Sequence, residues 1–513
     1  MRMLSTLLVL SCGTLTFGQA GTLDPTLGGL GIIITAIGQG GHNGNAVAVQ
    51  PDGKIVVAGD YGGFTSSFAV LRYHVDGSLD STFDGDGIVI TDVTSQPDVI
   101  HSLVIQPDGR IVVAGRSYDA QQTKFSVARY NPDGSLDPTF DQDGIVLISV
   151  GGEADICRSM ILQPDGKILL AGSCTLGTND EFALVRIHPD GALDNSFSQD
   201  GRLITAIGAE DDDAFSAALQ PDGRILLVGE SDNGTDLDVA MVRYNTDGSL
   251  DTSFGVGGKV TTAIGNERDQ ARSVVVQPDG KILVAGQRRL VGFEDGFIIR
   301  YHADGTVDTS FGVDGIVLTD GPASELCGGL ALQADGKIVF AGYAHDGGVY
   351  ALLMRCEQDG SKDLGFGTNG QVITTQFAGG TEVRAVAMQN DGRIVVSGDY
   401  YEGLTGDHMM LLRYLSGLNI GMAEFSASDK NVLIYPNPLA DQAVLEYELR
   451  EAVHLTCTLN DAQGKFVRTL FANMSRAAGP HREEVVLAGL PAGTYSLVLN
   501  DGSGRVSVRI VKQ

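Results

Sequence analysis

The chain has 513 residues, and its 35 Lys and Arg against 64 Asp and Glu leave a formal net charge of −29. A protein this acidic lacks the basic surface that nucleic acids and anionic membranes require, so neither is an expected partner. The apolar fraction of 43% is typical of a folded protein, and no apolar run reaches the ~18 residues of a mature transmembrane helix. The 69 glycines and the lack of Trp favour tight turns between short strands.

Residues 1–20 are predicted to be a secretory signal peptide. Arg2 supplies the positive charge, Leu4–Leu10 the short apolar core, and Gly18-Gln19-Ala20 the small-residue cleavage site. A lipoprotein signal is the alternative, because Val9-Leu10-Ser11-Cys12 loosely resembles a lipobox. Both alternatives predict export.

The next part of the chain, residues 21–417, repeats one unit of 56 or 57 residues. Each unit has four short runs rich in Val, Ile and aromatic residues and bounded by Gly, Asp or Pro, which predicts four β-strands. Four-stranded units repeated around an axis are typical of a β-propeller. The tetrapeptide Gln-Pro-Asp-Gly, with Ala or Asn replacing Pro in the last two copies, begins at Gln50, Gln106, Gln163, Gln220, Gln277, Gln333 and Gln389.

The two ends of this region complement each other. A second signature, Gly-Ser-Leu-Asp-x-Thr/Ser-Phe, precedes the fourth strand of each unit, and a copy at Gly21–Leu27 precedes a lone strand at Ile32–Thr35. The last unit stops after its third strand, at Leu411–Tyr414. A closed ring uses both fragments in one blade and removes open sheet edges, whereas an open β-solenoid has no use for them. We therefore predict an all-β, seven-bladed β-propeller closed by its N- and C-terminal strands.

Each unit also repeats an Arg in its third strand and an Asp in the turn that follows. These residues form either a ring of charges around a site or a charge-assisted hydrogen bond that holds the turn. We favour the structural interpretation, because a feature needed in every unit is usually architectural. The pairs are Arg72 with Asp80, Arg129 with Asp137, Arg186 with Asp194, Arg243 with Asp251, Arg300 with Asp308, Arg355 with Asp363, and Arg413 with Asp24.

Five cysteines remain after the signal peptide, an odd number that does not indicate a disulfide framework. One pair depends on the register of a hairpin. A two-residue turn at Asp165-Gly166 places Cys157 opposite Cys174, whereas a three-residue turn that includes Pro164 directs the thiols to opposite faces. The sequence leaves this disulfide open.

The candidate binding residues lie in the loops that differ between units. In a propeller these loops share one face, while the uniform turns share the other, and binding sites usually occupy variable loops on a rigid scaffold. Exposed aromatic residues stack on sugars or anchor protein partners, and the acidic loops leave calcium binding open. The candidates are Tyr61, Phe64, Tyr118, Asp211, Asp212, Asp213, Phe293, Tyr400 and Tyr401.

No catalytic motif is recognisable: the chain lacks HExxH, GxSxG, a P-loop and zinc-ligand spacing. We therefore expect no catalytic residue, metal or cofactor, and a monomer that binds a polysaccharide or a protein without catalysis. The alternative is an exported hydrolase or lyase that uses acidic residues on the variable-loop face.

After an expected linker at 418–430, residues 431–513 alternate in short strands that predict a small Ig-like β-sandwich. Tyr435-Pro436-Asn437-Pro438, Asp461–Lys465 and Leu490–Tyr495 follow one another in an order that resembles the type IX secretion sorting domain of Bacteroidota. The residues that carry the resemblance are Pro436, Asn437, Pro438, Gly464, Pro491, Gly493 and Tyr495.

This resemblance implies recognition by the type IX secretion machinery and passage through the periplasm and outer membrane. Secretion or attachment to the cell surface then follows. The 57-residue unit in turn resembles the delta-60 repeat family, which implies a propeller-like fold and no agreed activity.

Overall fold

The computed structural model describes residues 19–38, 40–119, 121–321, 324–377, 379–401, 407–417, 433–435, 442–449, 452–461, 466–491, 493–500 and 505–512. The chain divides into two compact units, Met1–Gly417 and Leu418–Gln513. The predicted signal peptide, except for Gln19 and Ala20, and the expected linker lie outside the described residues. The described elements are strands and one 3₁₀ turn, η1 (Gly63–Thr65), and none is a helix able to span a membrane.

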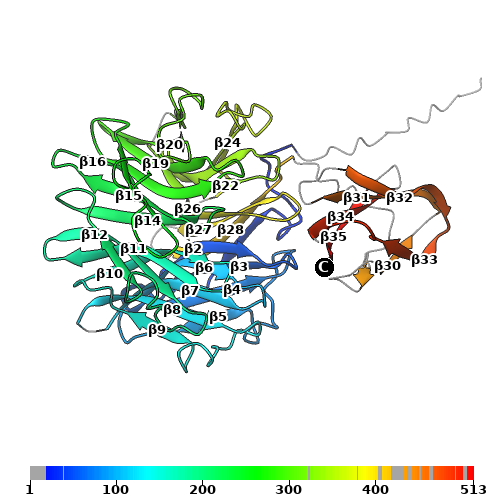
Figure 1. Cartoon of the computed structure of the whole chain (residues 1–513), viewed down its shortest axis with the longest axis horizontal. Helices are drawn as coiled ribbons and strands as arrows, with labels where there is room; N and C mark the ends of the chain where they lie inside the picture. The colour runs from blue at the N-terminus through cyan, green and yellow to red at the C-terminus, as the bar shows by residue number, and fades with distance from the viewer. Residues whose placement is uncertain are drawn as a thin grey trace, which may run out of the picture. The chain divides into compact units, whose positions relative to one another are not determined.

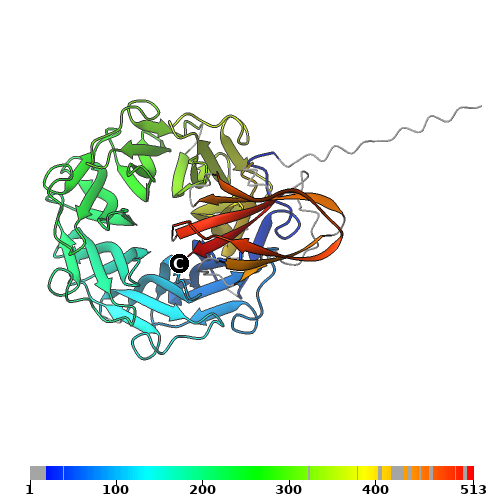
Figure 2. The same ribbon diagram turned by 45° about the vertical axis from the view of Figure 1, so that its right-hand side comes forward.

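The described residues of the first unit form seven four-stranded antiparallel sheets, here called blades 1 to 7, which surround a common axis (Figures 1 and 2). Blade 1 consists of β2 (His42–Val49), β3 (Ile55–Tyr61), β4 (Ser67–Tyr73) and β5 (Ile88–Thr91). Blade 2 consists of β6 (Asp98–Ile105), β7 (Ile111–Tyr118), β8 (Thr123–Tyr130) and β9 (Ile145–Ile148). Blade 3 consists of β10 (Asp155–Leu162), β11 (Ile168–Leu176), β12 (Asn179–Ile187) and β13 (Arg202–Thr205).

Blade 4 consists of β14 (Asp212–Leu219), β15 (Ile225–Asp232), β16 (Leu237–Tyr244) and β17 (Lys259–Thr262). Blade 5 consists of β18 (Asp269–Val276), β19 (Ile282–Leu290), β20 (Phe293–Tyr301) and β21 (Ile316–Leu318). Blade 6 consists of β22 (Ser324–Leu332), β23 (Ile338–His345), β24 (Val349–Cys356) and β25 (Gln371–Thr374). Blade 7 consists of β26 (Gly380–Met388), β27 (Ile394–Tyr401), β28 (Asp407–Tyr414) and, from the other end of the chain, β1 (Ile32–Thr35).

Blade 7 joins the two ends of the ring. Strand β1 pairs antiparallel with β28, so that Ile32 faces Leu412 and Thr35 faces Met409. The innermost strands contact one another in a closed cycle, β2 to β6, β10, β14, β18, β22, β26 and back to β2. The predicted all-β propeller is therefore confirmed. Because β1 pairs with β28, it supplies the fourth strand that the repeat of β26, β27 and β28 lacks.

The middle strands of each blade are buried on both faces because neighbouring blades cover them. In blade 1, all seven residues of β4 are buried, and so are the first six of β3. A strand buried on both faces reads as a continuous apolar run rather than an alternating one. This explains why the second and third runs of each repeat are the most apolar, and it places the hydrophobic core between blades.

The repeated arginines and aspartates meet in all seven blades. Each arginine Nε lies 2.7–2.8 Å from the carboxylate of its partner aspartate, and the pair in blade 7 joins Arg413 to Asp24. Both members of every pair are buried. We call the seven arginines of these pairs, Arg72, Arg129, Arg186, Arg243, Arg300, Arg355 and Arg413, the clamp arginines.

Each clamp arginine also reaches the next blade. Arg72 of blade 1 donates to the carbonyl of Pro132 in blade 2, and Arg413 of blade 7 donates to that of Val75 in blade 1, which completes the circle. In the other five blades the acceptors are the carbonyls of Pro189, Thr246, Ala303, Gln358 and Ser416. A clamp therefore fixes its own turn and one blade-to-blade contact together.

The cysteine pair of blade 3 is not bonded. A five-residue turn places Leu162 opposite Ile168, and a bulge then shifts the register so that Cys157 faces Gly172 and Cys174 faces Asp155. Both cysteines are buried free thiols, and burial raises the pKa of each to about 12.

The described residues of the second unit form two sheets around their own core. One contains β29 (Leu433–Tyr435), β30 (Gln442–Leu449) and β33 (Gly479–Val486). The other contains β32 (Phe466–Arg476), β31 (Val453–Asp461), β34 (Gly493–Asn500) and β35 (Arg505–Lys512). Of the sorting residues, Pro436, Asn437, Pro438 and Gly464 lie outside the described residues, while Tyr495 is buried and donates from its hydroxyl to the Pro491 carbonyl, at 2.8 Å.

Candidate functional site

A β-bulge interrupts the innermost strand of every blade. In blade 2 the register shifts between Ile100 and Ser102, so His101 is the extra residue opposite β7. A bulge of this kind bends the strand and redirects one side chain. The position lies five residues before the Gln of the following turn, and its occupants, here called the bulge residues, are Asn45, His101, Arg158, Phe215, Arg272, Gly328 and Arg384.

A glycine in the second strand makes each bulge possible. A Cβ atom on Gly229 would lie 1.8 Å from the carbonyl oxygen of Asp213, and the six equivalent glycines give 1.7–1.9 Å. No side chain fits at such a distance, so only glycine allows the bulged strand to approach this closely. The seven glycines are Gly59, Gly115, Gly172, Gly229, Gly286, Gly342 and Gly398.

The redirected side chains of several blades converge. The guanidinium groups of Arg158 from blade 3 and Arg272 from blade 5 each lie 4.5 Å from the centre of the Phe215 ring of blade 4. His101 of blade 2 lies within electrostatic range of both arginines and of Arg384 of blade 7. Residues from blades so far apart around the ring can meet only at its axis.

The residue after each glycine of the second strand adds to this group. The residues at this position are Asp60, Arg116, Ser173, Glu230, Gln287, Tyr343 and Asp399. Only blades 1 and 7 have the same residue type here. Arg116 lies within range of His101. We call His101, Arg116, Arg158, Phe215, Arg272 and Arg384 the axial cluster.

Acidic and amide side chains surround the axial cluster. Glu230 accepts hydrogen bonds from Arg268 Nε, at 2.7 Å, and from Gln270 Nε2, at 2.9 Å. Asp399 accepts from the amide N–H of Gly44, at 2.9 Å, and from Arg384 Nε. Burial raises the pKa of Asp399 to about 6 although Arg384 opposes the shift. Burial and the four nearby arginines lower the pKa of His101 to about 3, so this imidazole is neutral near pH 7.

The aromatic candidates lie in three different settings. Tyr118 and Phe293 are exposed at 37% and 42% at the ends of blades 2 and 5. Tyr61 is half-buried and stacks on His42, with ring centroids 5.0 Å apart. Tyr400 is buried. The side chain of Phe64 lies outside the described residues, and Tyr401 is half-buried.

The three consecutive acidic candidates have three different roles. Asp211 is exposed and accepts from the amide of Asp180, at 3.0 Å. Asp212 is buried and accepts from the amide of Ile207, at 2.6 Å, as Asp98, Asp155 and Asp269 do in their own loops. Asp213 pairs with Arg158 of the axial cluster, at 3.1 Å. Within the described residues, no group of three or more His, Cys, Asp or Glu is placed to hold a metal ion.

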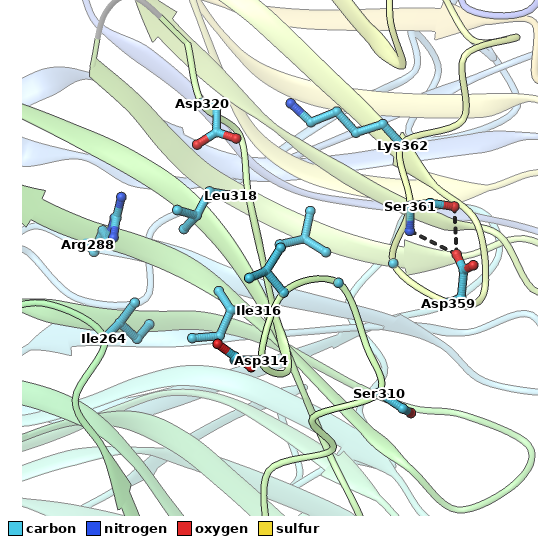
Figure 3. A pocket seen from close by; sticks show the side chains of 14 residues that line it. Ile264, Arg288, Ser310, Asp314, Ile316, Leu318, Asp320, Asp359, Ser361 and Lys362 are labelled. Carbon is cyan, nitrogen blue, oxygen red and sulfur yellow. Dashed lines mark hydrogen bonds between the residues drawn. The ribbon is translucent and has the colours of Figure 1, made fainter.

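The cavities at the periphery belong to the repeat. A cavity of about 680 Å³ lies between the outer strand of blade 5 and the turn of blade 6, where Ser361 donates twice to Asp359, at 2.9 and 2.6 Å (Figure 3). Equivalent residues of blades 3 and 4 enclose about 510 Å³, with Ser249 and Asp247 in the places of Ser361 and Asp359. Because the same hollow recurs, it follows from blade packing and is a weak candidate for a specific site.

The axial cluster is the group that sequence reasoning missed. The sequence did contain an indication of it. The residue five positions before the Gln of each turn differs in chemical type between blades, whereas the residues around it are similar from blade to blade. The bulge itself has no sequence signature beyond the facing glycine, so the direction of these side chains was not predictable.

Comparison with known proteins identifies both units. Residues 50–83, 106–140, 163–197, 220–254, 277–311 and 333–366 match a domain of unknown function (DUF5122) beta-propeller, and residues 433–513 match a secretion system C-terminal sorting domain. No curated protein matches the chain.

Solved structures with a similar fold include a protein of unknown function from Dyadobacter fermentans, at 13% identity over 75% of this chain and 97% of that one, with a TM-score of 0.41. The polysaccharide lyase Uly1 is similar at 13% identity over 72% of this chain and 89% of its own, with a TM-score of 0.42. Sqt1 of Chaetomium thermophilum is similar at 13% identity over 75% and 97%, with a TM-score of 0.42. The two family matches show that the chain carries DUF5122 β-propeller repeats and a type IX secretion sorting domain, which implies an origin in the Bacteroidota and delivery to the cell surface or the medium.

Proposed function

We propose that this exported propeller is a binding module that recognises a polysaccharide or a protein without altering it. The proposed surface is the face of the variable loops together with the axial cluster that they surround. Tyr118 and Phe293 present exposed rings on this face, and the axial cluster supplies charged groups. Aromatic rings and arginines are the side chains that contribute most to recognition.

One observation carries this proposal: some positions of the repeat are the same in all seven blades, whereas others differ in almost every blade. The clamp arginine and its aspartate are the same in all seven blades, whereas the bulge residues are Asn, His, Arg, Phe, Arg, Gly and Arg. A position that only supports the fold has the same task in each blade. Positions that differ are those where the blades contribute separately to one asymmetric surface.

An exported hydrolase or lyase is the second candidate, favoured by the carboxyl group of Asp399. Its pKa of about 6 is in the range that suits a general acid or base, and it lies beside Arg384. The same carboxyl group is, however, buried and hydrogen-bonded to Gly44 of blade 1, which is also what a structural contact between blades 7 and 1 requires.

The test is a screen of the full chain against arrayed glycans and against proteins of the bacterial envelope and its surroundings. We expect a ligand whose binding weakens at least tenfold in Tyr118→Ala or Phe293→Ala, with no product released during incubation. The matched controls are Val256→Ala and Val313→Ala, because these residues are 88% and 77% exposed in the uniform turns. Equal losses in both sets, or no ligand of either class, contradict the proposal; release of shortened chains that Asp399→Asn abolishes favours the enzyme instead.

A further inference from the structure

We propose that the axial cluster is a binding site for a compact oxyanion, held between Arg116, Arg158 and Arg272. The chemistry is that of a carboxylate, sulfate or phosphate. Its source is either the acidic group of a saccharide or the free ion. This inference deepens the binding role proposed above, and it rests on that role for the saccharide source.

The first support is the convergence of like charges. Four arginines, from blades 2, 3, 5 and 7, approach one imidazole in a protein whose net charge is −29. Phe215 holds two of them in place, because Arg158 and Arg272 lie over its ring at 4.5 Å each. Desolvation by the surrounding blades, and after it the charge of Arg158, lowers the pKa of both Arg116 and Arg272, so part of the shift is repulsion between these cations. A bound anion offsets this repulsion.

The second support is the distribution of ion pairs. Arg158 is paired with Asp213, and Arg384 is paired with Asp399 and Glu382. Within the described ranges, neither Arg116 nor Arg272 has a carboxylate within 4.0 Å of its guanidinium nitrogens. Both side chains are exposed to solvent and form no ion pair within these ranges, although the charges of Asp60 and Glu230 act on Arg116 and Arg272 from a greater distance.

The third support is a set of hydrogen-bonding nitrogens without partners. Arg158 Nε and His101 Nε2 are buried, and neither has a hydrogen-bond partner in the described structure. A buried donor left unsatisfied costs about 1–3 kcal/mol, whereas an oxyanion accepts several hydrogen bonds at once. In the tautomer that has its proton on Nε2, the neutral His101 imidazole donates to such a ligand without adding a further charge.

The overall charge limits which anions reach this site. Most of the surface of a protein with a net charge of −29 repels a long polyanion. One acidic group at the axis lies among the arginines of the axial cluster. The site therefore suits a single ionised group or chain end, and it does not suit a nucleic acid that needs a continuous basic surface.

Isothermal titration calorimetry of the full chain at low ionic strength tests this site. The probes are sodium sulfate, a short galacturonic acid oligomer and the neutral galactose oligomer of equal length. We expect sulfate or galacturonate to bind, binding to weaken at least tenfold in Arg272→Gln and in Arg116→Gln, and Arg272→Lys to restore part of it. Arg289→Gln is the matched control, because Arg289 lies on the same loop face, is 64% exposed, and is not part of the axial cluster.

The possible results distinguish the two sources of the anion, and they also distinguish this inference from the proposed function. Galacturonate that binds at least tenfold more tightly than sulfate identifies the saccharide source, and equal affinities identify the free ion. Absence of binding by both anions, or binding unchanged in Arg272→Gln and Arg116→Gln, overturns the axial site. A neutral glycan that binds wild type and Arg272→Gln equally leaves the proposed function in place and removes only this inference. Unchanged melting temperatures of the variants show that lost binding is not lost folding.

Discussion

The clamp arginines and the bulge residues occupy two positions that recur once per blade with the same period. The first position is Arg in every blade, and each clamp arginine contacts the turn aspartate of its own blade and a carbonyl of the next. The second is Asn, His, Arg, Phe, Arg, Gly or Arg, and His101 at this position lies within electrostatic range of arginines from blades 3, 5 and 7.

The difference separates a position that supports the fold from a position to which we assign recognition as a proposal. A clamp makes the same two contacts in each blade, so any replacement breaks both. A bulge residue lies at the axis, where a ring of identical side chains would place seven like groups together. Variation is therefore tolerated at the axis, and it supplies an asymmetric set of groups there.

The largest expected effect follows from removing the strand that closes the ring. Deletion of residues 21–35 takes away β1, Asp24 and the hydrogen bond of Thr35 with the Tyr73 hydroxyl, and it exposes β28 as an open edge. We expect the melting temperature to fall by more than about 10 °C and the protein to aggregate. Differential scanning calorimetry measures this, and an unchanged melting temperature argues against closure by the two ends.

The next effect compares a clamp with a bulge residue of the same blade. Arg300→Met removes the clamp arginine of the buried Asp308, which costs about 3 kcal/mol, the low end for a broken buried ion pair, because Lys281 remains 3.0 Å from the carboxylate. Arg272→Met, at the bulge of blade 5, removes an exposed cation that repels its neighbours, and the expected change is below about 1 kcal/mol. Urea unfolding measures both, and equal losses mean that the bulge arginine is as structural as the clamp.

A similar or smaller loss of stability is expected when a glycine that permits a bulge is replaced, and replacing another glycine should cost less. Gly229→Ala places a Cβ atom 1.8 Å from the Asp213 carbonyl and must undo the bulge, which we expect to cost about 2–4 kcal/mol. Gly265→Ala is the control, because its Cβ meets no atom closer than 3.5 Å. Thermal unfolding of the two variants is the measurement. Similar stabilities would show that the bulge is not fixed by the glycine.

The smallest effect concerns pH. The pKa of His101 is about 3 in the folded protein and about 6.5 when unfolded, so between these values the unfolded chain binds more protons. Stability therefore falls as the pH falls below 6.5, by about 1–2 kcal/mol at pH 5 from this group alone.

In His101→Gln, the loss of stability between pH 6.5 and pH 5 that this imidazole causes should disappear. The loss below pH 4 should remain, because hydrogen bonds from Thr82 and Lys54 and the charge of Arg72 outweigh burial and hold the pKa of Asp80 well below its usual value. Urea unfolding at pH 7, 5 and 3.5 checks both windows. The same loss at pH 5 in wild type and variant contradicts the assignment.

Much of the fold was predictable because it depends on local sequence patterns. The turn tetrapeptide, the apolar runs and the half-repeat at Gly21–Thr35 predict the strands and the mixed blade without reference to distant contacts. The positions of the candidate binding residues were less predictable. Tyr400 and Asp212 are polar or aromatic loop-end residues by sequence, yet both are buried, because the strands extend further into the loops than their apolar runs indicate.

By itself, the sequence determined the repeat, the order of strands, the pairing of each clamp arginine with its aspartate and the destination of the protein, since each depends on spacing or on a short motif. Only the tertiary structure decided that every clamp reaches the next blade and that His101, Arg116, Arg158, Phe215, Arg272 and Arg384 gather at one place. The physical reason is that a bulge turns one side chain toward the axis, and residues about 57 or more positions apart become neighbours there only when the ring is closed.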